Sequence, residues 1–207
     1  MNLESINKYI AGLYAGQETR DKYVEKTELK EFIPVVDDDV ARLLKLLLRL
    51  VCPKKVLEVG TSIGYSTTSM AQVVRAYGGK IFTVEFDKQV AEQARKNFEG
   101  AGVSNCIELL IGDAQEILPQ LETGFDFIFL DVDKRLYSKL LPSCAHLLRS
   151  GGILAAEDTL FPVIDLDPKW HYLIAPVDEF NRLICTHDEL ESTILPIGDG
   201  VTIAVRK

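Results

Sequence analysis

The chain has 207 residues, 47% of them hydrophobic and 26% charged, which suits one globular α/β domain. Its net charge of −8, with no basic stripe interleaved with aromatic residues, argues against a nucleic-acid-binding surface. No apolar run is long enough to span a bilayer, and the start lacks the pattern of a signal peptide, so we expect a cytoplasmic protein without a membrane partner. The cysteines and histidines are dispersed, without zinc spacing or a recognisable catalytic triad.

Residues 1–34 are largely polar and compatible with helix, and we treat them as an N-terminal helical segment that precedes a core at 35–207. Residues 37–51 (DDDVARLLKLLLRLV) give the clearest helix pattern, with acidic residues at the start and apolar residues every three and four positions. Pro53 ends this helix.

From residue 55 onward, strand and helix patterns alternate, which predicts right-handed crossovers and a parallel sheet. Strands are expected at 55–60, 80–86, 106–113, 125–132 and 153–158, and helices at 65–77, 88–102, 114–121 and 137–152. The end differs, because 191–207 contains two strand-like runs joined by Gly-Asp-Gly, which indicates a hairpin. The sequence therefore predicts an α/β fold whose parallel sheet is closed by an antiparallel hairpin.

The segment 57–66 (LEVGTSIGYS) follows a strand and opens a helix, the place where open α/β sheets bind ligands. Gly60 and Gly64 allow a tight turn. The dinucleotide fingerprint G-x-G-x-x-G is incomplete, because Ser62 replaces its middle glycine and the third is missing. A ligand that ends in an amino acid needs less bare backbone, and a serine hydroxyl with helix amides can hold its carboxylate. A purely structural glycine turn is the alternative.

Two acidic residues end the next two strands. Glu85 ends "FTVEF", where a carboxylate can accept both hydroxyls of a ribose, and Asp113 follows "LLIG", where it can accept from an adenine amino group. Either residue can instead cap the helix that follows, and for Asp113 the two interpretations stay open.

A second acidic group follows two further strands: Asp131 after "FIFL", and Glu157 with Asp158 after "ILAA". Strand ends of a doubly wound sheet share one edge, so these carboxylates can converge. Oxygen ligands suit Mg²⁺, with Mn²⁺ or Ca²⁺ as alternatives. The competing positive partner is Lys134, which would make a simple ion pair with Asp131 or Asp133.

Taken together, six segments make residues 35–207 resemble one family, the cation-dependent O-methyltransferases of the caffeoyl-CoA and catechol type, which includes small bacterial members. They are VLEVGTSIGYSTTSMA, VEFD, GDAQEILPQL, FDFIFLDVDKRLY, LLRSGGILAAEDTLF and LPIGDGVTIAVRK. The resemblance implies a class I methyltransferase Rossmann-like fold, with a seven-stranded, mostly parallel sheet, an antiparallel C-terminal strand and helices on both faces. It also implies S-adenosylmethionine as methyl donor, a catechol-like hydroxyl as acceptor, and a homodimer.

The resemblance also assigns roles to residues. Those that fall where the family binds the donor are Glu58, Gly60, Thr61, Ser62, Gly64, Tyr65, Ser66, Glu85, Phe86, Asp113, Ala114 and Asp131. Asp131 and Lys134 match the aspartate and lysine of the family's D-x-D-K motif, and Asp131, Glu157 and Asp158 fall at the metal positions. The family's second metal pair is Asp-Asn, so Glu157 and Asp158 depart from its pattern.

The acceptor side departs further, because Phe161 stands where the family has tryptophan. Phe161, Trp170 and Tyr172 can wall an aromatic acceptor or simply pack, and for Tyr172 packing is the favoured interpretation.

The function implied is direct transfer of a methyl group to a phenolic hydroxyl, with Lys134 taking the proton and a cation lowering the pKa of the acceptor. Three alternatives stay open at this point. They are a metal-independent methyltransferase acting on another small nucleophile, a catalytically quiet protein that binds S-adenosylmethionine, and a nicotinamide-dependent oxidoreductase, which Ser62 and the hairpin disfavour.

Overall fold

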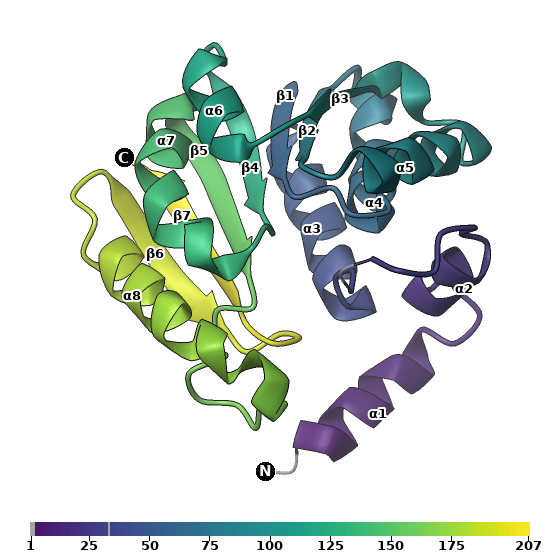
Figure 1. The fold of residues 1–207 in the computed structure, drawn as a ribbon, viewed down its shortest axis with the longest axis horizontal. Coiled ribbons are helices and arrows are strands. Elements are labelled where there is room, and N and C mark those ends of the chain that lie inside the picture. Colours follow the sequence, from purple (N-terminus) through teal and green to yellow (C-terminus); the bar gives the residue numbers. More distant parts are fainter. Residues whose placement is uncertain (1–2, 33) are drawn as a thin grey trace.

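The computed structural model describes residues 3–32 and 34–207 (Figure 1). One seven-stranded sheet runs through it. Its strands are β1 Lys55–Val59, β2 Lys80–Glu85, β3 Ile107–Ile111, β4 Phe125–Leu130, β5 Leu148–Glu157, β6 Leu190–Leu195 and β7 Val201–Arg206.

The strand order is β3-β2-β1-β4-β5-β7-β6. Strands β1 to β5 pair in parallel, and β7 runs antiparallel to both of its neighbours, β5 and β6. This confirms the mostly parallel seven-stranded sheet with an antiparallel C-terminal strand. The strand order reverses between β1 and β4, because the connections of these two strands leave in opposite directions. Open α/β sheets bind ligands at the carboxyl ends of the strands beside such a reversal.

Helices cover both faces of the sheet, as expected. They are α1 Leu3–Leu13, α2 Arg20–Glu25, α3 Asp38–Val51, α4 Tyr65–Val74, α5 Lys88–Gly100, α6 Ala114–Ile117, α7 Tyr137–Leu147 and α8 Ile174–Cys185. Short 3₁₀ turns lie at η1 Arg75–Tyr77, η2 Ser104–Cys106, η3 Leu118–Gln120, η4 Lys134–Leu136 and η5 Pro168–Leu173. Apolar side chains of α3, α4 and α5 pack on one face, and those of α6, α7 and α8 pack on the other.

The glycine pair Gly151–Gly152 corrects one prediction, because residues 148–152 belong to β5 and not to the preceding helix. Leu148 already pairs with Phe125, and the register then shifts before Ile153 pairs with Phe127. A side chain at Gly152 would press on the backbone oxygens of Phe125 and Arg149, at 3.0 and 2.9 Å. The glycines therefore allow an irregular stretch between two paired segments.

Helix α8 is absent from the prediction altogether. Its first turn contains Pro176, and the stretch before it is rich in proline and aspartate, which favours a turn. Proline is tolerated in a first turn because the backbone N–H groups there have no partner within the helix. Val177, Phe180 and Ile184 form the buried stripe that holds α8 to the protein.

None of the helices among the described residues has the length and apolarity that a bilayer crossing requires. The N-terminal helices α1 and α2 lie outside the sheet, as Figure 1 shows in purple.

Candidate active site

The loop between β1 and α4 lies at the carboxyl end of the central strands and is shaped by backbone that few residues adopt. Gly60, Ser62 and Gly64 all have positive φ, at 101°, 47° and 85°. A side chain at Gly60 would overlap the carbonyl oxygen of Asp131, so only glycine lets β1 end against the first residue after β4. The loop and the acidic cluster are thus built against each other.

Glu58 is fully buried beneath this loop. Its carboxylate accepts hydrogen bonds from Ser66 (2.6 Å), from Thr83 (2.6 Å) and from Thr67. Burial raises the pKa of Glu58 to about 7, against the opposing effect of these hydroxyl groups. Because the Ser66 hydroxyl donates its proton to Glu58, these two residues fix the start of α4. Direct contacts of Glu58 and Ser66 with the methyl donor stay predictions.

Glu85 lies at the end of β2, and its carboxylate binds the backbone of the same loop. One carboxylate oxygen accepts from the Ser62 N–H (2.8 Å) and the other from the Asp87 N–H (3.0 Å). The hydroxyls of Thr61 and Thr83 are 2.6 Å apart in the layer below. A carboxylate has lone pairs for further hydrogen bonds, and the contact of Glu85 with ribose hydroxyls stays a prediction.

Asp113 shows the capping alternative directly, because its carboxylate accepts from the Gln115 N–H (2.8 Å) at the start of α6. Phe86 is 74% exposed beyond β2, and Ala114 is buried behind Asp113. An exposed aromatic ring and a capped helix start therefore border the place where the family resemblance puts the adenine.

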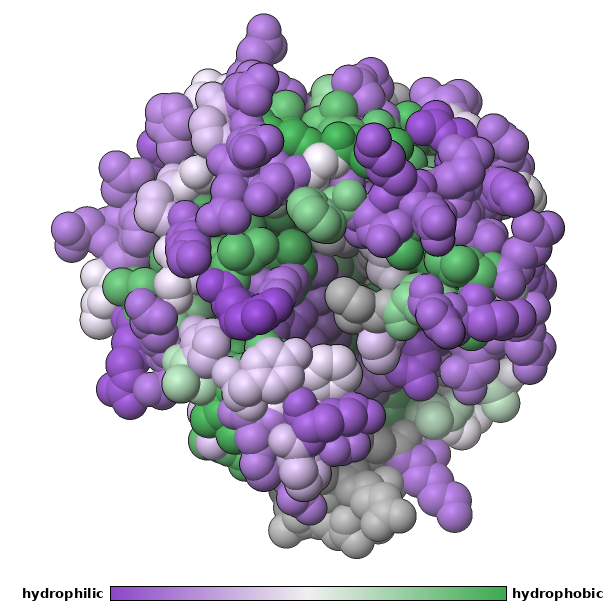
Figure 2. Space-filling model, in the orientation of Figure 1, coloured by the Kyte–Doolittle hydropathy of each residue, from purple (hydrophilic) through white to green (hydrophobic). Residues whose placement is uncertain are grey.

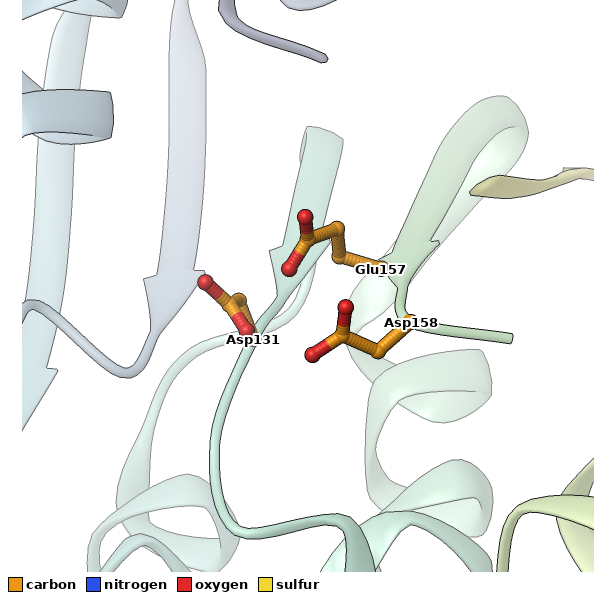
Figure 3. Close-up of side chains that lie close together, drawn as sticks. All are labelled: Asp131, Glu157 and Asp158. Carbon is orange, nitrogen blue, oxygen red and sulfur yellow. The ribbon is translucent and has the colours of Figure 1, made fainter. Parts of the chain in front are cut away.

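Asp131, Glu157 and Asp158 converge at the ends of β4 and β5 (Figure 3). One oxygen atom from each lies within 4.8 Å of the other two. The fold therefore brings these three side chains together, as the sequence predicted.

Lys134 is buried beside the cluster. Its ammonium lies 2.7 Å from Asp131 Oδ1 and 2.9 Å from Asp158 Oδ2, while Asp133, the other expected partner, pairs with Arg135. Burial by itself would lower the pKa of Lys134, but Asp131 and the other nearby acidic groups outweigh it and hold the pKa well above the ordinary value. Lys134 is therefore a cation in this arrangement.

The three carboxyl groups of Asp131, Glu157 and Asp158 suit a divalent cation in two respects. Within residues 3–32 and 34–207, no group donates a hydrogen bond to the Glu157 carboxylate, although Glu157 is only 6% exposed. Burial and the charges of Asp131 and Asp158 accordingly raise the pKa of Glu157. When all three carboxyl groups are ionised, their charge exceeds that of the one Lys134 ammonium, and a bound cation would offset the remainder.

The backbone that carries the cluster is held by residues that the sequence did not single out. The Tyr137 hydroxyl is near the carbonyl oxygens of Leu130 (2.9 Å) and Glu157 (3.1 Å). Asp158 has a φ of 61°, and the next carbonyl, that of Thr159, accepts from the Asn181 side chain (2.7 Å). Tyr137 stands in the quoted segment "DKRLY", but nothing in its spacing indicates this contact.

The three aromatic residues that could wall an acceptor, Phe161, Trp170 and Tyr172, differ in how far they are buried. Phe161 is buried in a small cluster with Leu173 and Val177, against which Trp170 packs. Tyr172 is 55% exposed, and its ring lies 6.2 Å from that of Trp170 and 5.9 Å from the Arg135 guanidinium, so it packs at the surface and not in the core. On the face shown in Figure 2, both hydrophilic and hydrophobic residues border a recess near the middle of the view, close to where Figure 1 draws the end of β4.

Residues 17–207 match the model of a protein family described as O-methyltransferase. A catechol O-methyltransferase of Niastella koreensis is 30% identical over 216 residues, which cover 99% of this chain and 97% of that protein. A caffeoyl-CoA O-methyltransferase of Populus kitakamiensis is 30% identical over 224 residues, covering 98% and 94%.

Solved structures agree on the fold. A Podospora anserina methyltransferase, solved with S-adenosylhomocysteine, superposes with a TM-score of 0.86 at 24% identity and covers 100% of this chain and 97% of its own. An O-methyltransferase of Streptomyces achromogenes, solved with S-adenosylmethionine, gives 0.81 at 24% identity, covering 98% and 96%. The class I methyltransferase fold is confirmed, and the match over 17–207 sets aside the oxidoreductase alternative.

Proposed function

Because this chain belongs to the O-methyltransferase family, we propose that it transfers the methyl group of S-adenosylmethionine to a hydroxyl of a small catechol-like or phenolic acceptor, assisted by a divalent cation. The observation that carries the proposal is the convergence of Asp131, Glu157 and Asp158 beside a glycine loop at the carboxyl ends of β1 and β4.

The reaction is a direct displacement. The acceptor oxygen forms a bond to the methyl carbon as the bond from that carbon to the sulfonium sulfur breaks, and the sulfur keeps the electron pair. Since the methyl group is already activated, the protein mainly has to position both reactants and remove one proton. The loop at 60–66, with Glu85 and Asp113, would hold the donor.

Asp131, Glu157 and Asp158 would hold the cation, with Mg²⁺ expected and Mn²⁺ or Ca²⁺ as alternatives. When bound, such an ion supplies a Lewis acid that lowers the pKa of the acceptor hydroxyl and offsets the charge of the three carboxylates.

Lys134 is the residue that we assign to the acceptor proton. Its pKa is raised by Asp131, Asp158 and Glu157 and lowered by burial. A cation held by the three carboxylates would offset their charge and so weaken their effect on the pKa of Lys134. Burial would then lower this pKa and favour the neutral amine, which can take a proton.

One observation favours a second candidate, a metal-independent methyltransferase that acts on another small nucleophile. The Lys134 ammonium already bridges Asp131 and Asp158, so a positive charge of the protein itself occupies part of the place proposed for the cation.

Calorimetry distinguishes the two candidates. Mg²⁺, then Mn²⁺ and Ca²⁺, should be titrated into protein saturated with S-adenosylhomocysteine, and into two variants, Asp158→Ala and the control Asp178→Ala. Asp178 is on α8, paired with Arg182 and outside the cluster. Saturable binding that only Asp158→Ala removes, together with loss of metal-stimulated turnover, supports the cation. Tight product binding without cation binding, and activity that persists with a chelator, would leave the metal-independent reaction.

The partner and location predictions go with this proposal. We expect a homodimer in the cytoplasm whose partner is a small-molecule acceptor, with no nucleic-acid or membrane partner.

A further inference from the structure

Helix α2 contacts the loop that follows β1 through the side chain of Tyr23. Its hydroxyl is 3.0 Å from the carbonyl oxygen of Gly64, 3.4 Å from that of Ile63 and 2.9 Å from Thr68 Oγ1. Tyr23 is separated from these residues by about forty positions in the chain, so the N-terminal segment reaches back to the turn that opens α4.

This turn has an unusual backbone conformation. Ser62 and Gly64 have positive φ, and the Gly64 N–H bonds to the carbonyl of Thr61 (2.9 Å). Besides its contact with Tyr23, the Ile63 carbonyl accepts from the Asn97 side chain (2.9 Å) on α5. Side chains from two other elements therefore hold a backbone conformation that most residues avoid.

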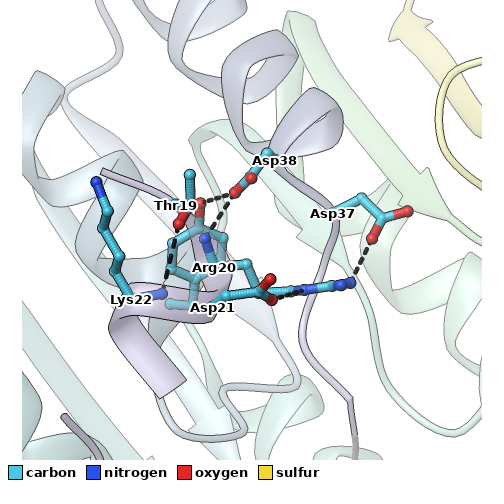
Figure 4. A network of polar contacts seen from close by, with 7 residues as sticks. Thr19, Arg20, Asp21, Lys22, Asp37 and Asp38 are labelled. Atoms are coloured by element: carbon cyan, nitrogen blue, oxygen red, sulfur yellow. Dashed lines mark hydrogen bonds and ion pairs between the residues drawn. The ribbon is translucent and has the colours of Figure 1, made fainter. Parts of the chain in front are cut away.

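A second link joins the same two segments. The Tyr65 hydroxyl donates to Asp38 Oδ1 (2.6 Å), and the same oxygen accepts from the backbone N–H of Arg20 (2.7 Å), the first residue of α2. Figure 4 shows Asp38 facing the start of α2, beside the ion pair between Arg20 and Asp37. The rings of Tyr23 and Tyr65 pack edge to face, with centroids 5.3 Å apart.

We infer that Tyr23 is a positioning residue for the methyl donor: from α2 it holds the carbonyls of Ile63 and Gly64, so that the loop is in its binding conformation before the donor arrives. The inference rests on the proposed function of this loop. A preorganised loop spares the donor the cost of ordering it, which increases affinity.

The hydroxyl is suited to this role because it stays a donor. Burial raises the pKa of Tyr23 above its ordinary value, and Thr68 and Asn97 only partly oppose this. The proton is therefore retained throughout the neutral range, and the contact does not depend on pH there.

The test compares Tyr23→Phe with Tyr77→Phe. Phenylalanine keeps the ring contact with Tyr65 and removes only the hydroxyl. Tyr77 is also half-buried, and its hydroxyl donates to one carbonyl, that of Leu48 (2.9 Å). Its own carbonyl accepts from Lys54, so it lies near the amino end of β1. It therefore controls for the general loss of one tyrosine hydrogen bond.

S-adenosylhomocysteine should be titrated calorimetrically into the wild type and both variants. We expect Tyr23→Phe to weaken binding about threefold to tenfold, the worth of one hydrogen bond, and Tyr77→Phe to leave it within twofold. Hydrogen exchange in ligand-free protein should become faster at residues 62–68 in Tyr23→Phe alone. The KM for the donor should rise more than kcat falls.

Equal affinity and equal exchange at 62–68 in Tyr23→Phe and wild type would overturn the inference while the donor role of the loop stands. If the wild type does not bind S-adenosylhomocysteine, the proposed function itself fails. If the substitutions act only through a general loss of stability, Tyr23→Phe and Tyr77→Phe should bind S-adenosylhomocysteine equally well. That result would also contradict the positioning role of Tyr23.

Discussion

The hydroxyl of the fully buried Tyr137 lies 3.1 Å from the carbonyl oxygen of Glu157 and also contacts the carbonyl of Leu130. These two carbonyls lie at the ends of β5 and β4, next to the carboxylates of Asp131, Glu157 and Asp158. One side chain from the start of α7 thus ties together the two strand ends that form the cluster.

Tyr137→Phe should therefore weaken cation binding several-fold while donor affinity stays the same. The loss of one buried hydrogen bond should lower the free energy of unfolding by about 1 kcal/mol. Calorimetric titration with Mg²⁺ and urea unfolding measure the two effects. If the variant binds Mg²⁺ as the wild type does, Tyr137 stabilises the fold without positioning the cluster.

Lys134→Met should separate turnover from cation affinity, because Lys134 is both the proposed proton acceptor and the ion that competes with the metal. We expect turnover to fall by about a hundredfold or more, Mg²⁺ affinity to rise, and donor affinity to stay within twofold. Lys139→Met, at an exposed position of α7, is the control. Near-normal turnover in Lys134→Met would remove Lys134 from the mechanism.

Glu58→Gln should change how stability depends on pH. Burial raises the pKa of Glu58 to about 7 from the ordinary 4.5, so the folded protein holds this proton more tightly than the unfolded chain. The contribution of Glu58 is therefore present below about pH 4.5 and is lost as the pH rises through about 7, by up to roughly 3 kcal/mol. Urea unfolding between pH 5 and pH 8 should show a smaller decline for Glu58→Gln.

The exposed Glu191→Gln serves as control for that experiment and should follow the wild type. Parallel curves for wild type and Glu58→Gln would mean that Glu58 keeps the same charge in folded and unfolded chains.

Gly60→Ala should be far more damaging than Gly78→Ala, although both glycines have positive φ. At Gly78 nothing lies within 4 Å of an added Cβ, so alanine meets only the backbone strain of the left-handed region, about 1 kcal/mol. At Gly60 the added carbon overlaps the Asp131 carbonyl, which is backbone and cannot move without displacing β4. Thermal unfolding and donor titration of both variants test this, and equal effects would contradict the close approach.

Much of the fold follows from local pattern. The alternation of apolar runs with helical periodicity located β1 to β4 to within about two residues, because burial on both faces demands continuous apolar strands, whereas β5 begins at Leu148 instead of residue 153. The Gly-Asp-Gly turn correctly indicated the β6–β7 hairpin. Helix α8 was missed because Pro176 and the acidic stretch before it look like a turn, and only packing of Phe180 and its neighbours makes that segment helical.

The site divides in the same way. By itself the sequence determined that Asp131, Glu157 and Asp158 follow two strands of a parallel sheet, and parallel strands bring their carboxyl ends to one edge. Only the tertiary structure decided that Lys134 bridges Asp131 and Asp158 and that Glu58 is buried under the loop. It also decided that Tyr23 holds the backbone of this loop and that Tyr137 holds the backbone of the acidic cluster. Those contacts join residues far apart in the chain or depend on side-chain direction, and no local spacing encodes either.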